Sequence, residues 1–192
     1  FKLPELPKEV KEKLDAMISN LDKYSKVVTI ENKDIMCITL LPPTKLHPED
    51  KLTNEEAEKI KKRINVLVVI DVETKKDWPV LRDKIIKNCI DKAKDIDENI
   101  YVTVMDVAEI RDNCFDAKYD ILSMIVGGAA VYDPKDFLGA IKISEVHKNM
   151  VIKKFDKYIV SYVAVGSLFR GDATSHDIDV AVVIDDTDVK KM

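Results

Sequence analysis

The sequence predicts a mixed α/β protein built from two similar units. Two nearly continuous apolar runs rich in Val and Ile, Ile64–Ile70 and Ile178–Ile184, are typical of strands buried on both faces. Segments with apolar residues at helical spacing alternate with such strands, which favours helices packed on a sheet. Hydrophobic residues make up 46% and charged residues 34% of the 192 positions, a composition of folded domains.

The first third of the chain is predicted to contain a helix and a hairpin. Val10, Leu14 and Met17 recur at helical spacing, so we expect a helix from Lys8 to about Lys23. Val27–Ile30 and Ile35–Leu41 are predicted to pair as strands across a polar turn. The remaining predicted elements are a helix from a capping box at Thr53 and Glu56 to about Lys62, strand Ile64–Ile70, helix Trp78–Ala93, strand Ile100–Met105, helices Asp106–Asn113 and Lys118–Val126, strand Ala129–Tyr132, a helical linker Pro134–Phe155 with possible breaks at Gly139 and Ser144, and strands Tyr158–Val165 and Ile178–Ile184.

An internal repeat connects the two apolar strands. The run RINVLVVID from Arg63 aligns with DIDVAVVID from Asp177, 114 residues later, and a helix followed by a strand precedes each run. The identical pairs are Ile64 with Ile178, Val66 with Val180, Val68 with Val182, Val69 with Val183, Ile70 with Ile184 and Asp71 with Asp185. We therefore expect one complete unit over residues 1–134 and the first part of a second over residues 135–192. Because the chain begins at Phe1 and stops at Met192, just after the second run, we expect it to be a fragment.

Two acids at the start of the second run suggest a metal site. Asp177 and Asp179 are two apart, so in a strand their side chains share one face. Two like charges on a buried strand are costly unless a cation offsets them, and Mg²⁺ or Mn²⁺ with oxygen ligands is the simplest cation. The turn Gly166-Ser167, at the end of the preceding strand, can offer backbone N–H groups and a hydroxyl to a phosphate. This combination suits metal-assisted phosphoryl or nucleotidyl transfer.

The run GSLFRGDATSHDIDVAV from Gly166 resembles the signature of the nucleotidyltransferase superfamily of the DNA polymerase β type. That signature is a Gly-Ser turn, often an Arg-Gly, and then an acid–apolar–acid step on a strand. The matching positions are Gly166, Ser167, Arg170, Gly171, Asp177, Ile178 and Asp179.

The resemblance implies a Mg²⁺-dependent enzyme that moves a nucleoside monophosphate from an NTP to an acceptor. Asp177 and Asp179 would be the catalytic metal ligands, and Gly166 and Ser167 would bind the triphosphate. Arg170 either contacts a phosphate or forms a structural salt bridge. The acceptor could be RNA, a protein hydroxyl or a small molecule. The family's third carboxylate stands on the following strand, so we expect the remaining C-terminal part of the same protein to complete the site and residues 1–192 alone to transfer nothing.

The first unit lacks this chemistry. Arg63 and Asn65 replace the two acids, Pro42-Pro43 stands where Gly166-Ser167 would be, and Thr103 is nearest to the place of a third carboxylate. This degenerate copy keeps open an alternative reading of the whole protein as a non-catalytic nucleotide- or partner-binding module.

The cysteine spacing, the length of the apolar runs and the net charge give expectations about the compartment and the partners of the protein. Cys37, Cys89 and Cys114 lack metal-ligand spacing and lie among apolar residues, so we expect reduced thiols in a cytoplasmic protein. No apolar run approaches the length of a membrane span, and we expect no membrane partner. A net charge of −4 gives no general support for nucleic-acid binding.

Overall fold

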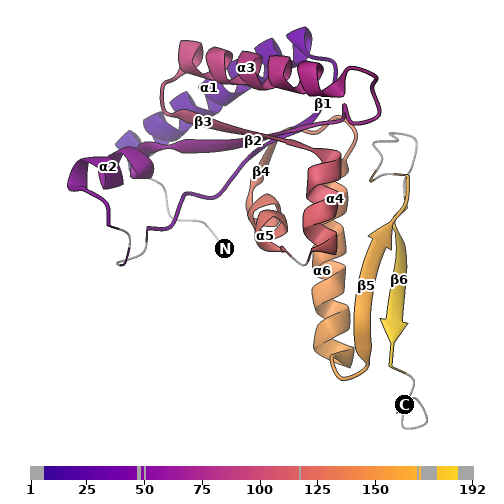
Figure 1. The fold of residues 1–192 in the computed structure, drawn as a ribbon. Coiled ribbons are helices and arrows are strands. Elements are labelled where there is room, and N and C mark those ends of the chain that lie inside the picture. The colour runs from indigo at the N-terminus through magenta and orange to yellow at the C-terminus, as the bar shows by residue number, and fades with distance from the viewer. Residues whose placement is uncertain are drawn as a thin grey trace.

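The computed structural model describes residues 7–46, 49, 51–116, 118–167, 169 and 177–185. This part of the chain is mixed α/β, as the sequence predicts (Figure 1). Its elements are α1 (Lys8–Glu31), β1 (Ile35–Leu40), α2 (Asn54–Lys62), β2 (Ile64–Ile70), α3 (Trp78–Ile96), β3 (Ile100–Asp106), α4 (Val107–Phe115), α5 (Asp120–Gly127), β4 (Ala129–Tyr132), α6 (Phe137–Phe155), β5 (Ile159–Val165) and β6 (Asp179–Ile184). Within these residues, no helix is long and apolar enough to cross a membrane.

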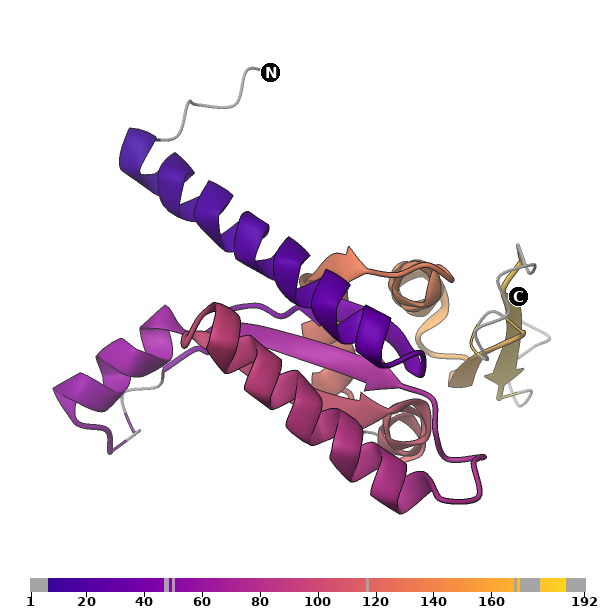
Figure 2. The ribbon, with the colours of Figure 1, turned by 90° about the horizontal axis from the view of Figure 1, so that it is seen from above.

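A four-stranded sheet in the order β3-β2-β1-β4 forms the middle layer of the first unit. β1 pairs antiparallel with β2 and β4, and β2 pairs in parallel with β3. Helices α1 and α3 lie side by side over one face (Figure 2), and α4, α5 and the N-terminal half of α6 cover the other. The result is a three-layer α/β/α arrangement.

The central strand β2 contributes to both cores. Val66, Val68 and Ile70 face α1 and α3, whereas Leu67 and Val69 face the opposite helices, and all five side chains are fully buried. Period-two alternation therefore places apolar groups on both faces, as the continuous apolar run of this strand predicts.

Helix α1 is longer than predicted. Val27–Ile30 is the last turn of this helix and not a strand, so the predicted hairpin of Val27–Ile30 with Ile35–Leu41 is wrong, and β1 pairs instead with β2, which follows after α2. Tyr24 and Val28 continue the buried face of α1 at helical spacing and join the core between the sheet and α3. This burial outweighs the local strand preference of the β-branched residues Val27, Thr29 and Ile30.

The second unit consists of α6 and a two-stranded ribbon of β5 and β6. Helix α6 is continuous through Gly139 and Ser144. Its N-terminal residues Phe137, Leu138 and Ile141 belong to a core cluster of the first unit, so the two units share this helix. The ribbon lies beside the C-terminal half of α6, away from the four-stranded sheet (Figure 1), where the Tyr162 hydroxyl is 2.8 Å from His147 Nδ1.

The expectation that β6 is buried on both faces is wrong for this structure. Every residue of the strand is exposed. The physical reason is that, within the described residues, β6 pairs only with β5, and no layer of helices there covers β6 as α1 and α3 cover β2.

The two hairpins nevertheless share one register. Counting along the chain, Ile35 to Leu40 of β1 correspond to Ile159 to Ala164 of β5 at an offset of 124, and β2 corresponds to β6 at an offset of 114. With these offsets every pair between β1 and β2 has its counterpart between β5 and β6, which add the pair Val165 with Asp179, and both pairings show a register shift at the same place, after Ile35 and after Ile159.

One backbone hydrogen bond is repeated as well. The Asp71 N–H donates to the Asp34 carbonyl (3.0 Å), and the Asp185 N–H donates to the Tyr158 carbonyl (2.8 Å), which are the corresponding positions. The helix that precedes each hairpin also ends at the corresponding residue, Glu31 in α1 and Phe155 in α6. The sequence repeat is thus matched by a repeat of strand pairing.

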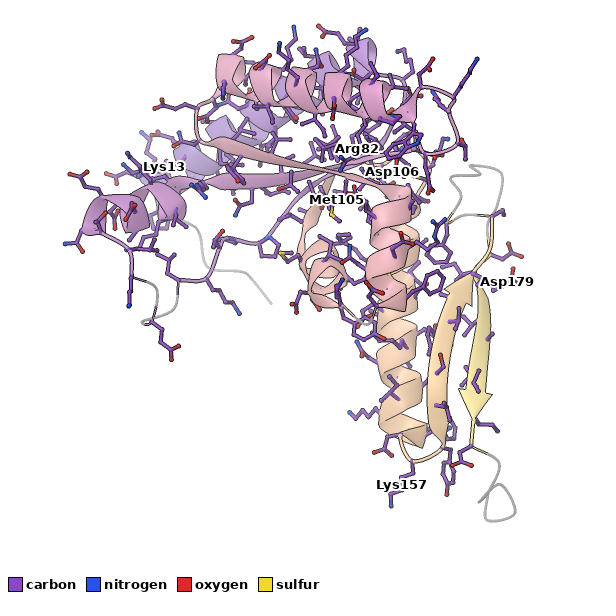
Figure 3. The ribbon with its side chains drawn as sticks, in the orientation of Figure 1. Lys13, Arg82, Met105, Asp106, Lys157 and Asp179 are labelled. Carbon is purple, nitrogen blue, oxygen red and sulfur yellow. The ribbon has the colours of Figure 1, made fainter. Side chains whose placement is uncertain are left out.

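Buried Asp106 closes the first unit where β2 and β3 end (Figure 3). Its carboxylate accepts the Val72 N–H (3.0 Å) and the Ala108 N–H (2.9 Å), and Glu109 completes a capping box by accepting the Asp106 N–H. Arg82 from α3 pairs with Glu109 at 2.9 Å. The ends of β2 and β3 and the helices α3 and α4 are therefore connected through the pair Asp106 and Glu109.

We predict that Asp106→Ala lowers the free energy of unfolding by about 2–4 kcal/mol, because it removes a helix cap and leaves the buried Val72 N–H without an acceptor. Urea unfolding followed by circular dichroism measures this change. Asp91→Ala, at an exposed position of α3, is the control and should stay within about 0.5 kcal/mol of the parent. Equal losses for the two variants would contradict the capping role.

Candidate functional site

The candidate site lies at the end of the ribbon where β5 stops and β6 begins, opposite the end that carries Lys157 (Figure 3). Val165 pairs with Asp179, so Gly166 follows directly beside the first residue of β6. A Cβ added to Gly166 would lie 3.6 Å from Asp179 Oδ2 and 3.9 Å from the Asp177 carbonyl oxygen. The antiparallel pairing therefore places Gly166 next to the Asp179 carboxylate and the Asp177 backbone, although Asp177 lies 11 positions further along the chain.

Gly166 has a backbone conformation that other residues rarely adopt. Its φ is +129°, outside the range of L side chains, so the glycine is needed for the backbone itself. Space is less restrictive, since every atom near the added Cβ would be at ordinary van der Waals distance. The conformation turns the chain out of β5 toward Ser167, which is half-buried.

Phe169 anchors the far side of this turn. Its partly buried ring packs against the core cluster of the first unit that contains Leu138 and Ile141 of α6. The loop that begins at Gly166 is thus attached to the ribbon at one end and to the first unit at Phe169. Arg170 and Gly171, the other residues of the predicted motif, lie outside the described residues.

Asp177 and Asp179 are exposed, which corrects part of the electrostatic expectation. Two solvated carboxylates carry no large desolvation cost. The sequence argument for a cation, which depended on the cost of burying two like charges, therefore does not apply here. Among the described residues there is also no cluster of three or more metal-ligating side chains. What remains is the Asp179 carboxylate beside Gly166, with exposed Asp177 two positions earlier in the chain, and solvated carboxylates of this kind suit a Mg²⁺ ion whose other ligands are phosphate oxygens and water.

The corresponding end of the first hairpin is occupied by its own side chains. The Asn65 amide donates to Thr44 Oγ1 (3.1 Å), just past the two prolines, and the Arg63 guanidinium stacks on the Tyr101 ring at 4.6 Å. The register of β2 and β3 places Tyr101 beside Asn65, whereas Thr103 lies beside Leu67. The position nearest the two replaced acids is therefore Tyr101 rather than Thr103, and neither residue is an acid.

The carboxyl ends of the parallel strands β2 and β3 are the other place where an α/β sheet could hold a ligand. There Asp106 is a buried acid, and its role was not predicted from the sequence. Both of its oxygens accept backbone N–H groups of the protein. The pattern Asp106-x-x-Glu109 is a capping-box signal that could have identified this structural role.

No protein-family model, curated protein or solved structure matches this chain.

We predict that Gly166→Ala destabilises the ribbon by about 1–3 kcal/mol, because alanine must leave the native φ or remain strained there. Hydrogen exchange of the β5 and β6 amides reports the local loss. The control is Gly139→Ala inside α6, where helix propensity favours alanine and only the Asp136 carboxylate, 3.3 Å from the added Cβ, has to shift. Unchanged exchange in the Gly166 variant would show that the positive φ is not required.

Proposed function

We propose that this protein is a Mg²⁺-dependent nucleotidyltransferase that moves a nucleoside monophosphate from an NTP to an acceptor hydroxyl. The observation that carries the proposal is that Gly166 lies directly beside the Asp179 carboxylate and the Asp177 backbone at one end of the ribbon. These residues match the nucleotidyltransferase signature in the sequence, and strand pairing brings them together across a loop.

The proposed roles follow from the chemistry of each group. The turn presents backbone N–H groups and the Ser167 hydroxyl, which suit triphosphate oxygens. Asp177 and Asp179 would hold the metal together with those phosphates, and Mg²⁺ would neutralise charge on the transferring phosphoryl group. Arg170 is proposed as a further phosphate contact. The acceptor class stays open among RNA, protein and small molecules.

The same geometry makes nucleotide binding depend on the metal. Without a cation, the carboxylate of Asp179 beside Gly166 repels a triphosphate bound at the turn. A divalent ion between the carboxylates and the phosphates reverses the sign of this interaction. Binding of NTP and metal should therefore be strongly coupled.

We predict that a non-hydrolysable NTP binds in the presence of Mn²⁺, and that Asp179→Asn weakens this binding at least about tenfold by removing a metal ligand. Isothermal titration calorimetry with and without Mn²⁺ measures it. The matched control is Asn65→Ala, at the corresponding position of the first hairpin, which should leave the affinity unchanged. Equal binding by the parent and Asp179→Asn would contradict the assignment of Asp179 as a metal ligand. Nucleotide binding of equal strength with and without Mn²⁺ would instead favour the non-catalytic binding module.

We also predict that the double substitution Arg63→Asp and Asn65→Asp gives the first unit no metal-dependent nucleotide binding. Pro42 occupies the place of Gly166 and has no backbone N–H to offer a phosphate. Calorimetry measures the number of nucleotides bound per chain. The two substitutions are combined with Asp179→Asn, which removes the metal ligand of the second unit. A restored binding site in that triple variant would show that the two prolines do not prevent phosphate binding.

A further inference from the structure

The first unit carries Arg63 and Asn65 where the second unit carries its two acids. The correspondence holds in the strand pairing as well. The Leu41 N–H donates to the Asn65 carbonyl at 2.8 Å, and the counterpart of Leu41 in β5 pairs with Asp179. A guanidinium and an amide thus replace two carboxylates at the same end of a hairpin. Because the sign of the charge is reversed, this end of the first hairpin suits an anion and not a cation.

Among the described residues, Arg63 is the arginine without a carboxylate partner. Arg82 pairs with Glu109 at 2.9 Å. Arg111 pairs with Glu73 at 3.6 Å. Arg63 forms no ion pair with a described residue, and it is exposed, so its N–H donors are available to a ligand from solution.

Tyr101 of β3 positions this guanidinium. Tyr101 pairs with Asn65 across the parallel strands, and Arg63 lies two positions before Asn65, so the three side chains share one face of the sheet. The guanidinium carbon of Arg63 lies 4.6 Å from the centre of the Tyr101 ring. Stacking of this kind uses the flat face of the guanidinium and leaves the N–H donors along its edge free. Since 53% of Tyr101 is accessible, the stack lies at the surface.

The helix that leads to Arg63 adds positive charge. The acids of α2 lie in its first half, and its three lysines, Lys59, Lys61 and Lys62, lie in its last turn and are exposed. Together with Arg63, they make four of the five positions 59–63 positive. This run ends at the exposed ring of Tyr101. Positive charge beside an exposed aromatic ring is the combination with which proteins bind single-stranded nucleic acids.

We propose that the Arg63–Tyr101 stack, together with the lysines of α2, is a binding site for single-stranded nucleic acid. The guanidinium edge and the lysines contact phosphates, and bases stack on the exposed pair. Asn65, whose amide donates to Thr44 Oγ1 at 3.1 Å, adds a hydrogen-bond acceptor on the same face. The site gives the first unit, which lacks the two acids, a binding role of its own. It does not depend on the proposed nucleotidyl transfer.

The net charge of −4 makes the location of the positive charge decisive. A chain with this net charge has no general attraction for phosphate backbones, so binding depends on the local group of cations around Arg63. We therefore expect binding that is sensitive to single substitutions at the site and that weakens as salt concentration rises.

The test is fluorescence anisotropy of a labelled single strand of about ten nucleotides, oligo(dT) and oligo(U) in separate titrations, with the 192-residue chain in EDTA. The chelator removes divalent cations, so the result is independent of the proposed metal site. Arg63→Ala should weaken binding at least about tenfold and Tyr101→Ala at least about fivefold. Tyr101→Phe, which keeps the ring, should stay within about twofold of the parent.

Two variants are matched controls. Tyr119 is also 53% exposed and has Lys148 at 5.5 Å from its ring centre, but Lys148 is paired with Glu145. Arg111→Ala removes the same charge as Arg63→Ala from another exposed arginine. Tyr119→Ala and Arg111→Ala should each change the affinity by less than about twofold. Circular dichroism checks that all variants fold.

Three results would overturn the proposal. The first is no binding by the folded parent. The second is an equal loss of affinity in Arg63→Ala and Arg111→Ala, which would show that only net charge matters. The third is displacement of the strand by a competitor without bases at matched charge. Displacement by inorganic phosphate would indicate a simple anion site, and displacement by polyglutamate would indicate a site for an acidic protein segment.

Discussion

The antiparallel pairing of β1 with β2 is the interaction on which the rest of the structure depends. It places β2 between β1 and β3, where Val66, Val68 and Ile70 meet one helix layer and Leu67 and Val69 meet the other. It also aligns the end of α1, because the Asp71 N–H reaches back to Asp34 just after that helix. The same pairing, with the same register shift and the same returning hydrogen bond, is found again in β5 and β6.

In the second unit this register forms the end of the ribbon at which the nucleotide site is proposed. Pairing Val165 with Asp179 is what brings Gly166 against the acids, so the proposed site is a direct consequence of hairpin geometry. In the first unit the same positions carry Pro42, Arg63 and Asn65, and their side chains pack locally on Tyr101 and Thr44. The same strand pairing therefore leads to an end that is packed with side chains in the first unit and to an accessible end in the second.

The two units also differ in how many helices and strands surround the apolar strand, β2 in the first and β6 in the second. β2 is buried because α1 and α3 cover one face and three further helices cover the other. β6 has nearly the same sequence, yet its residues are exposed because the described chain supplies only β5 and α6 as neighbours. Burial is therefore a property of the layers around a strand and not of the strand alone. An exposed ribbon of Val and Ile is a surface that favours association.

The sequence by itself determined the types of the elements other than Val27–Ile30, which was predicted as a strand and is helical, together with the repeat and the choice of the candidate site residues. Apolar periodicity, the capping box at Thr53 and the Gly-Ser and Asp-x-Asp steps are local patterns, and local patterns are sufficient to identify them. Only the tertiary structure decided that α1 continues to Glu31, because burial of Tyr24 and Val28 comes from α3, far along the chain. It alone also decided that Asp177 and Asp179 are exposed and that Asp106 is a buried cap. Exposure and hydrogen-bond partners depend on contacts between residues distant in sequence, which no local pattern contains.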